Sequence, residues 1–237
     1  MSAAIDAGLR AVLDAAGRWI AAAGMRPTPL PAALARMSGA LAGARLELTT
    51  QRHVGGGLAA LTLAAIADAD GLLRSATLIG LPDPATLGPV LGVDLIAFGG
   101  ALSLVAVDLS PTDLAHWHTR AAAELEALHL VVEGRVTPRK WPGFAEAVFS
   151  RRALIAGVKR GAEAPVLAAV AEFVAALAPV FPAATRPPDA VRVAAAAERA
   201  RAWRRAELAN RREHDALARI FGEANAAAYL EQLFGDP

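Results

Sequence analysis

Residues 91–110 read LGVDLIAFGGALSLVAVDLS. The two halves of this stretch are rich in leucine, valine and isoleucine, and the pair Gly99-Gly100 separates them. A glycine pair between two apolar runs is typical of the tight turn of a β-hairpin. We therefore predict two antiparallel strands, over residues 94–98 and 102–109.

The first of these strands contains one carboxylate, Asp94, within an otherwise apolar run. Burying a carboxylate is costly unless it is paired or hydrogen-bonded, and loss of solvent raises its pKa. A raised pKa suits a side chain that donates protons near neutral pH. Asp94 is therefore our candidate catalytic residue. The alternative is that Asp94 has no such role and faces solvent at the strand edge.

Upstream of the hairpin, three further segments have strand character. Residues 44–50 alternate apolar and polar side chains, and the segments 58–67 and 72–79 are apolar. Short turns that contain glycine join them, at 55–57 and 68–71. Because strands joined by such short turns run antiparallel to one another, we predict an antiparallel meander.

Segments with the periodicity of helices flank this meander on both sides. They are residues 2–23, 31–41, 112–128, 165–177, 190–221 and 226–234. Between them we predict a loop at 135–142, whereas 144–158 is ambiguous and could hold a last strand. Helices, then a meander, then helices favour an α/β fold, a three-layer α/β/α sandwich with a central antiparallel sheet.

The length of 237 residues fits one large domain, which can bury a sizeable core without cross-links. We predict a single domain over residues 1–237. Within it, residues 1–43 form an N-terminal helical segment, 44–160 are mostly sheet, and 161–237 are C-terminal helices. We expect the chain to be a monomer.

Composition excludes several kinds of site. The chain has no cysteine, so disulfides, thiolate metal sites and iron–sulfur clusters cannot form. His116 and His118 are two residues apart on a predicted helix, which places them on different faces, so we expect no metal there. The formal net charge is +1, which argues against a nucleic-acid partner even though one predicted helix is rich in arginine.

Hydropathy patterning argues against a membrane protein. The mean hydropathy is +0.37, but alanine accounts for most of it, and no run reaches the roughly 18 uncharged apolar residues that a membrane span needs. Asp6, Arg10 and Asp14 interrupt the N-terminal segment, which does not resemble a signal peptide. We expect a cytoplasmic protein without membrane contact.

A second informative stretch reads WRRAELANRREHDALARIFG, residues 203–222. It places Asn210 and Arg212 on a long predicted helix. A guanidinium group binds carboxylates as a planar fork, so Arg212 is a candidate for holding an acidic ligand. The alternative is an ordinary solvated helix face.

Several short motifs occur together in one order. They are PVLGVD at 89–94, VDLSP at 107–111, PGFAEAVFS at 142–150, Trp203, NRR at 210–212, FGE at 221–223, Tyr229 and LF at 233–234. In order and spacing they resemble the ferredoxin-dependent bilin reductases, from about residue 58 to residue 234. Each motif alone is weak, and the shared order carries the resemblance.

The resemblance implies an antiparallel sheet between helical layers, with an open-chain tetrapyrrole such as biliverdin between the sheet and the C-terminal helices. It also implies no bound organic cofactor. Reduced ferredoxin would supply electrons one at a time, and side chains would supply protons. Asp94 matches the aspartate of the family's proton-transfer set.

The chain departs from the family at two other proton-transfer positions. The expected glutamate falls on Thr62 and the expected histidine on Arg74. Thr62 cannot deliver a proton as a carboxylic acid does, and Arg74 stays charged, so it would anchor a propionate or lactam oxygen. Arg212 stands where the family has a lysine. We therefore assign substrate binding to Arg74, Thr62, Asn210 and Arg212.

Two further groups of basic residues are given roles by the resemblance. Lys159 and Arg160 are additional candidates for propionate anchors. Ferredoxin is acidic, so a basic rim could steer its docking; the rim would consist of Arg139, Lys140, Arg151 and Arg152. The replaced proton-transfer positions leave a second reading open, a non-catalytic tetrapyrrole-binding or carrier protein on the same fold.

Overall fold

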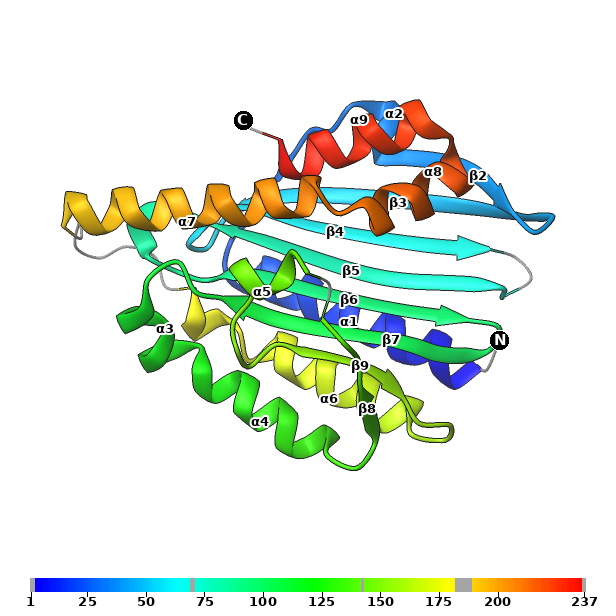
Figure 1. Ribbon diagram of the computed structural model, residues 1–237, viewed down its shortest axis with the longest axis horizontal. Coiled ribbons are helices and arrows are strands. Elements are labelled where there is room, and N and C mark those ends of the chain that lie inside the picture. The colour runs from blue at the N-terminus through cyan, green and yellow to red at the C-terminus, as the bar shows by residue number, and fades with distance from the viewer. Residues whose placement is uncertain (1–2, 69–70, 142, 182–188, 236–237) are drawn as a thin grey trace.

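The computed structural model describes residues 3–68, 71–141, 143–181 and 189–235. Over these residues the chain forms one nine-stranded sheet with helices on both faces (Figure 1). Every strand pair is antiparallel. The predicted three-layer α/β/α sandwich with a central antiparallel sheet is therefore confirmed.

The strands follow the order β1-β3-β4-β5-β6-β7-β9-β8, and β2 pairs with β3 beside β1. Their bounds are β1 Arg26–Thr28, β2 Arg36–Leu41, β3 Ala44–Gly55, β4 Leu58–Asp68, β5 Leu73–Pro82, β6 Val90–Phe98, β7 Ala101–Ser110, β8 Val136–Pro138 and β9 Leu154–Val158. The predicted hairpin is confirmed as β6 and β7, which lie near the middle of the sheet and are each longer than predicted.

Two groups of helices cover the sheet. One face carries α1 Ala3–Ala22, α3 Leu114–Arg120, α4 Ala122–Val132 and α6 Glu163–Ala175. The other face carries α2 Ala32–Ala35, α5 Ala145–Val148, α7 Ala190–Leu208, α8 Arg211–Phe221 and α9 Glu223–Phe234. In Figure 1, α1 passes behind the sheet, whereas α7 and α8 lie in front of it and α9 runs along its upper edge beside α2. None of the described helices is long and apolar enough to cross a membrane.

Side-chain alternation along β6 separates the two faces. Leu91, Val93 and Leu95 are at most 1% exposed, and they belong to the apolar cluster under α1 and α6. Full burial of such a side chain stabilises the fold by about 1.5–3 kcal/mol. Asp94 and Ile96 point to the other face and are half-buried. That second face is where the sheet is left partly open.

The N-terminal segment differs from the prediction. The helix predicted over 31–41 is wrong, because only Ala32–Ala35 is helical and Arg36–Leu41 forms β2. This strand pairs with β3 as a hairpin, and its Gly39 lies against the backbone of Ile220 in α8, where a side chain would collide. Tertiary pairing thus overrides the local helical pattern, and residues 1–43 are not wholly helical.

Three other boundaries shift. The helix predicted over 112–128 is two helices, α3 and α4, which meet at Ala121. The loop predicted over 135–142 contains β8, and the ambiguous segment 144–158 contains both α5 and the strand β9. Residues 69–70 of the predicted turn at 68–71 lie outside the described residues.

The long helix predicted over 190–221 is interrupted. Helix α7 ends at Leu208, and α8 begins at Arg211 after Asn210, whose backbone is non-helical with ψ 85°. Asparagine competes with helical hydrogen bonds through its own side chain and favours helix termini. The interruption brings Asn210 over the open face of the sheet.

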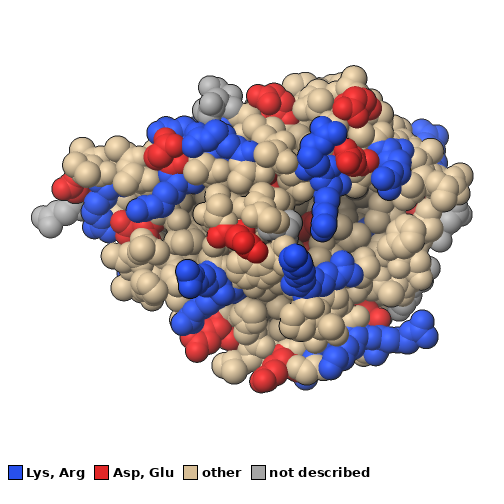
Figure 2. Space-filling model, viewed as in Figure 1, with Lys and Arg blue, Asp and Glu red and all other residues tan. Residues whose placement is uncertain are grey.

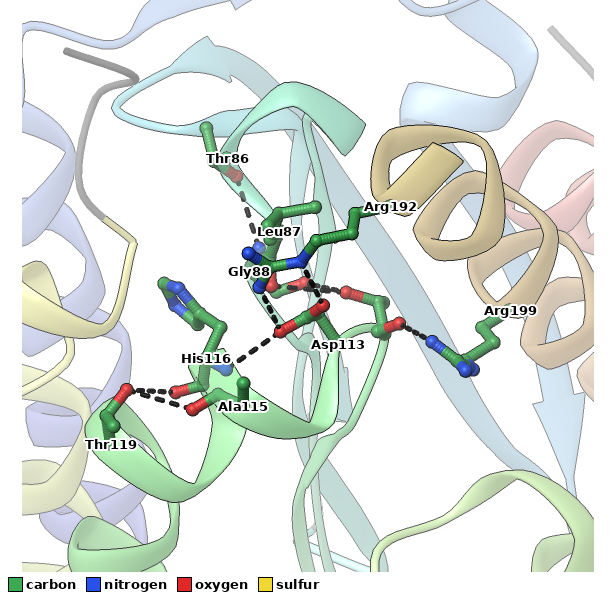
Figure 3. Close-up of polar contacts among 10 residues, drawn as sticks. Thr86, Leu87, Gly88, Asp113, Ala115, His116, Thr119, Arg192 and Arg199 are labelled. Carbon is green, nitrogen blue, oxygen red and sulfur yellow. Dashed lines mark hydrogen bonds and ion pairs between the residues drawn. The ribbon is translucent and has the colours of Figure 1, made fainter. Parts of the chain in front are cut away.

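Polar contacts fasten the first half of α7 to the end of the sheet (Figure 3). Asp113 caps α3 by accepting from the backbone N–H of His116, and it forms a two-pronged pair with Arg192 at 2.9 and 3.1 Å. Arg199 donates to the carbonyl of Thr112. These contacts hold the first half of α7 at the end of the sheet, and the side chain of Trp203, nearer its C-terminal end, reaches Gly92 of β6.

Candidate active site

A cleft lies between the open face of the sheet and helices α7, α8 and α9. It consists of two adjoining cavities of about 280 and 430 Å³. Both are lined by Thr77, Asp94, Leu104, Asn210, Arg212 and Glu213. Because these residues border both cavities, the cleft is continuous, with Asp94 at its middle. Figure 2 shows a hollow near the centre of this face with blue, basic side chains above and below it.

One end of the cleft is aromatic. Trp203 of α7 stacks on Phe149 with ring centroids 6.4 Å apart, and Phe234 of α9 meets Trp203 edge-on at 5.8 Å. The indole N–H of Trp203 is buried and has no hydrogen-bond partner among the described residues. A flat conjugated ligand could stack here and accept that hydrogen bond.

Asp94 is a half-buried acid at the floor of the cleft. Its carboxylate accepts a hydrogen bond from Thr77 Oγ1 at 2.9 Å. Burial raises the pKa of Asp94 above its ordinary value, and the bond from Thr77 only partly opposes that rise. The geometry therefore fits a carboxylic acid held ready to give up a proton to a ligand in the cleft.

Strand register identifies the neighbours of Asp94 across the sheet. Thr77 of β5 lies directly opposite it, and Ala64 of β4 lies opposite Thr77. Ala106 of β7 completes the row. Ala64 and Thr77 are therefore the residues in line with Asp94 on the β4 and β5 side of the cleft. Neither of these side chains is an acid.

The structure places Arg74 outside the cleft. Its side chain lies on the opposite face of the sheet from Asp94, where its Nε is 3.3 Å from Asp6 of α1. Adjacent strand residues face opposite sides, so a shift of three positions from Thr77 reverses the face. Arg74 therefore does not line this cleft, and its role in substrate binding stays a prediction that its position does not favour.

The structure does not place Thr62 in the lining of either cavity. Thr62 lies on the same face as Asp94 but two positions along the strand from Ala64, and it is buried. Its hydroxyl accepts a hydrogen bond of 3.4 Å from Arg52. Its contacts are those of a packing residue next to the cleft.

Asn210 and Arg212 line the cleft, and substrate binding by them stays a prediction. Arg212 is exposed and has no hydrogen bond or ion pair among the described residues, so its guanidinium is available to an acidic ligand. Lys159 and Arg160 line neither cavity. Arg139 and Lys140, which we predicted as part of a docking rim, line the smaller one.

Sequence reasoning missed two acidic residues that line the cleft. Glu207, in the last turn of α7, is 7% exposed, and Glu213 follows in the first turn of α8. Burial raises the pKa of Glu207 to about 7. Burial, together with the charges of Glu207 and Asp94, raises the pKa of Glu213 to about 8. The only sequence signal was their symmetrical spacing, three residues on either side of Asn210.

A buried network fixes the edge of the smaller cavity. Asp108 of β7 accepts hydrogen bonds from the Ser110 hydroxyl at 2.5 Å and from the backbone N–H of Ser150 at 2.9 Å, and the Ser150 hydroxyl also donates to it. Burial raises the pKa of Asp108 to about 6. The network joins the segment before β9 to the sheet. Within the described chain, no three acidic or histidine side chains are placed to share a metal ion.

A sheet covered by helices on both faces, with an aromatic and carboxylate-lined cleft on one of them, defines a ligand-binding α/β/α sandwich. The chain belongs to the ferredoxin-dependent bilin reductase family, whose model matches residues 13–236. One similar solved structure is phytochromobilin synthase from tomato, crystallised in complex with biliverdin. It superposes with a TM-score of 0.74 at 15% identity, covering 94% of this chain and 81% of that chain, which shows a shared fold. No curated protein sequence matches the chain.

Proposed function

We propose that this protein reduces an open-chain tetrapyrrole, biliverdin or a related bilin, with electrons from reduced ferredoxin and protons from side chains in the cleft. The observation that carries the proposal is Asp94, a desolvated acid at the middle of a continuous cleft between the sheet and the C-terminal helices. Family membership supplies the reaction class. Asp94 donates a proton to the pyrrole nitrogens or the lactam after an electron arrives.

Charges around the cleft suit a dianionic tetrapyrrole. Arg212 lines both cavities, and Arg139 and Lys140 line the smaller one. Propionate groups pair well with guanidinium and ammonium groups. We therefore assign propionate binding to these three residues in place of Arg74.

The rim also suits an acidic electron donor. Arg139 and Lys140 line the smaller cavity, whereas Arg151 and Arg152 line neither cavity and Arg152 pairs at 2.6 Å with Glu126 of α4. Basic residues at a rim accelerate encounter with an acidic partner, and added salt removes this advantage. Docking of ferredoxin here would bring its electrons close to the ligand.

The test is anaerobic reduction of biliverdin by chemically reduced ferredoxin, followed by absorbance. The wild-type protein should convert the pigment, and Asp94→Asn should lose turnover by a factor of about 10²–10⁴ while it still binds biliverdin. Asp14→Asn, an exposed site on α1, is the matched control and should behave as wild type. If the wild-type protein binds biliverdin and never reduces it, the catalytic proposal fails.

A second candidate is a non-catalytic tetrapyrrole-binding or carrier protein on the same fold. The observation that favours it is the pair Ala64 and Thr77, which stand beside Asp94 without an ionisable group. A carrier would bind biliverdin with an unchanged spectrum after ferredoxin is added. For a carrier, Asp94→Asn would alter the affinity or the bound spectrum only.

A further inference from the structure

Two glutamates on the helical side of the cleft face the strand side that holds Asp94. Glu207 ends α7 and Glu213 begins α8, and the amide of Asn210 lies between them, with its nitrogen 3.5 Å from Glu207 Oε2 and 3.4 Å from Glu213 Oε2. Asn210 thus joins two carboxyl groups over one cavity. Neither group has an ion-pair partner in the described chain, although Arg212 lies nearby on the same lining.

Another glutamate of α7, Glu198, has the ion pairs that Glu207 and Glu213 lack within the described ranges. Glu198 is exposed and pairs with Arg201 at 2.9 Å and with Arg205 at 2.8 Å, and these arginines lower its pKa. Glu207, nine residues later, is buried and faces two other carboxyl groups, which is the opposite environment. The segment 192–219 has eight arginines that could have paired its acids, yet these two glutamates have no arginine partner among the described residues.

The environment of Glu213 keeps it protonated at neutral pH. The titratable and charged groups that share its two cavities come from both the strands and the helices: Asp94, Asp108, Arg139, Lys140, Glu207, Arg212, Arg219 and Tyr229. Burial and the two neighbouring carboxylates raise the pKa of Glu213 to about 8. A carboxylic acid that remains protonated at pH 7 can act as a proton donor.

The reaction proposed above needs two protons for each double bond. Asp94 holds one at most, and its strand neighbours Ala64 and Thr77 offer no other acid. We propose, on the basis of that reaction, that Glu213 donates the second proton to the bound bilin, and that Asn210 and Glu207 position it. The helical side of the cleft then supplies the second proton donor, which the strand side lacks.

Electrons and protons balance in this step. Two reduced ferredoxins each give one electron and are oxidised. Asp94 gives one proton and Glu213 the other, so two new bonds to hydrogen form on the bilin and one double bond is lost. Both side chains are left as carboxylates. Both are half-buried, so water can reach them and protonate them again after product leaves.

The test compares single-turnover reduction in Glu213→Gln and in wild type. The variant should bind biliverdin within about twofold of wild type and accept the first electron. Its second half-reaction should slow by about a hundredfold or more, so that a one-electron-reduced bilin radical persists in EPR spectra. Glu213→Asp should restore part of the rate. Glu172→Gln, an exposed site on α6 on the other side of the sheet, is the matched control.

A second variant tests the positioning role of Glu207. In wild type the rate should fall above about pH 8, where Glu213 ionises. Glu207→Gln removes a negative charge that raises the pKa of Glu213, so the fall should begin at a lower pH. A role in packing alone would lower the rate equally at every pH and leave the profile in place.

The outcomes separate the two proposals. If wild type reduces biliverdin and Glu213→Gln does so at the same rate with the same pH profile, Glu213 is not the donor, and the proposed function stands. If wild type does not reduce biliverdin at all, the proposed function fails, and the role of Glu213 falls with it.

Discussion

The two faces of the central strand β6 are built differently. On the face toward α1 and α6, Leu91, Val93 and Leu95 are at most 1% exposed. On the face toward α7 and α8, Asp94 and Ile96 are half-buried beside a cleft. One strand therefore forms part of a closed apolar core and part of the floor of an open polar site.

The difference shows where stability and function come from. A well-packed face contributes most of the hydrophobic stabilisation, and that stabilisation offsets the cost of keeping acids desolvated on the other face. The cleft holds Asp94, Glu207 and Glu213, each with a pKa raised by burial. We therefore expect substitutions on the two faces of β6 to have separate effects, on stability at one face and on chemistry at the other.

The largest expected effect is on stability, at the closed face. Leu95→Ala should lower the free energy of unfolding by about 2–5 kcal/mol, because it leaves a cavity in a fully buried site. Ile96→Ala, one residue along, should cost clearly less, because its side chain borders a space that already exists. Urea denaturation of both variants measures the difference. Equal losses would mean that the two faces are equally packed.

The next effect is on the pH dependence of stability, at the open face. The pKa values of Glu207 and Glu213 are about 7 and 8 in the folded protein, above the ordinary 4.5 expected for the unfolded chain. The folded state therefore binds more protons between about pH 4.5 and 8. Stability should rise as pH falls from 8 toward 5, by about 1 kcal/mol or more, since a pKa that is higher by one in the folded state corresponds to about 1.4 kcal/mol.

Urea midpoints at pH 8, 6.5 and 5 measure how the free energy of unfolding changes with pH. Glu207→Gln and Glu213→Gln should each reduce that change, and Glu172→Gln should not.

Acids whose pKa is lowered by folding affect stability in a different, more acidic pH range. The pair with Arg192 lowers the pKa of Asp113, so its contribution is lost only as the pH falls below the ordinary range of aspartate. A midpoint that does not change between pH 8 and 5 would contradict the raised values.

Much of the fold could be predicted from local patterns. The hairpin around Gly99-Gly100 and the meander before it follow from turn residues and apolar runs, and both are confirmed. The segment 31–41 could not be predicted correctly, because its strand depends on pairing with β3, and the same local pattern also fits a helix. Pairing between distant segments is a tertiary property that periodicity alone does not report.

The candidate site was predictable only in part. Asp94, Asn210 and Arg212 lie together in the structure, because each belongs to a motif with fixed spacing. Thr62 and Arg74 do not line the cleft. The alanine-rich strand β4 gives no landmark that would separate Thr62 from Ala64, two residues along on the same face. On β5, Arg74 is three residues from Thr77, and an odd shift reverses the face. The strand pairing identifies Ala64 and Thr77 as the residues beside Asp94.

A smaller effect is expected on ligand affinity, and it compares the two faces through two arginines. Arg212→Gln should weaken biliverdin binding about tenfold, or about 1.4 kcal/mol, because it removes a guanidinium that lines both cavities. Arg74→Gln should leave the affinity unchanged, because Arg74 faces Asp6 on the other side of the sheet. Absorbance titration at two salt concentrations measures both. A loss of affinity in Arg74→Gln alone would reverse the assignment of the faces.

The smallest expected effect is a change in the pKa of Asp94 when Thr77 is substituted. It tests whether the Thr77 hydrogen bond contributes to that pKa. The hydroxyl of Thr77 donates to the Asp94 carboxylate at 2.9 Å and so lowers its pKa against the larger effect of burial. Thr77→Val removes the donor, so the pKa of Asp94 should rise further. Loss of a hydrogen bond worth about 0.5–1.5 kcal/mol would raise that pKa by about one or less.

In Thr77→Val, the pH profile of the single-turnover step in which Asp94 donates its proton should shift to higher pH. Thr77→Ser keeps the hydroxyl and should leave that profile unchanged. Unfolding should change little in either variant, because Thr77 is half-buried beside the cleft. A large loss of stability in Thr77→Val would mean that the open face also contributes to the core. In that case Thr77, which hydrogen-bonds to Asp94, would serve stability as well as chemistry, and the two faces of β6 would not have separate roles.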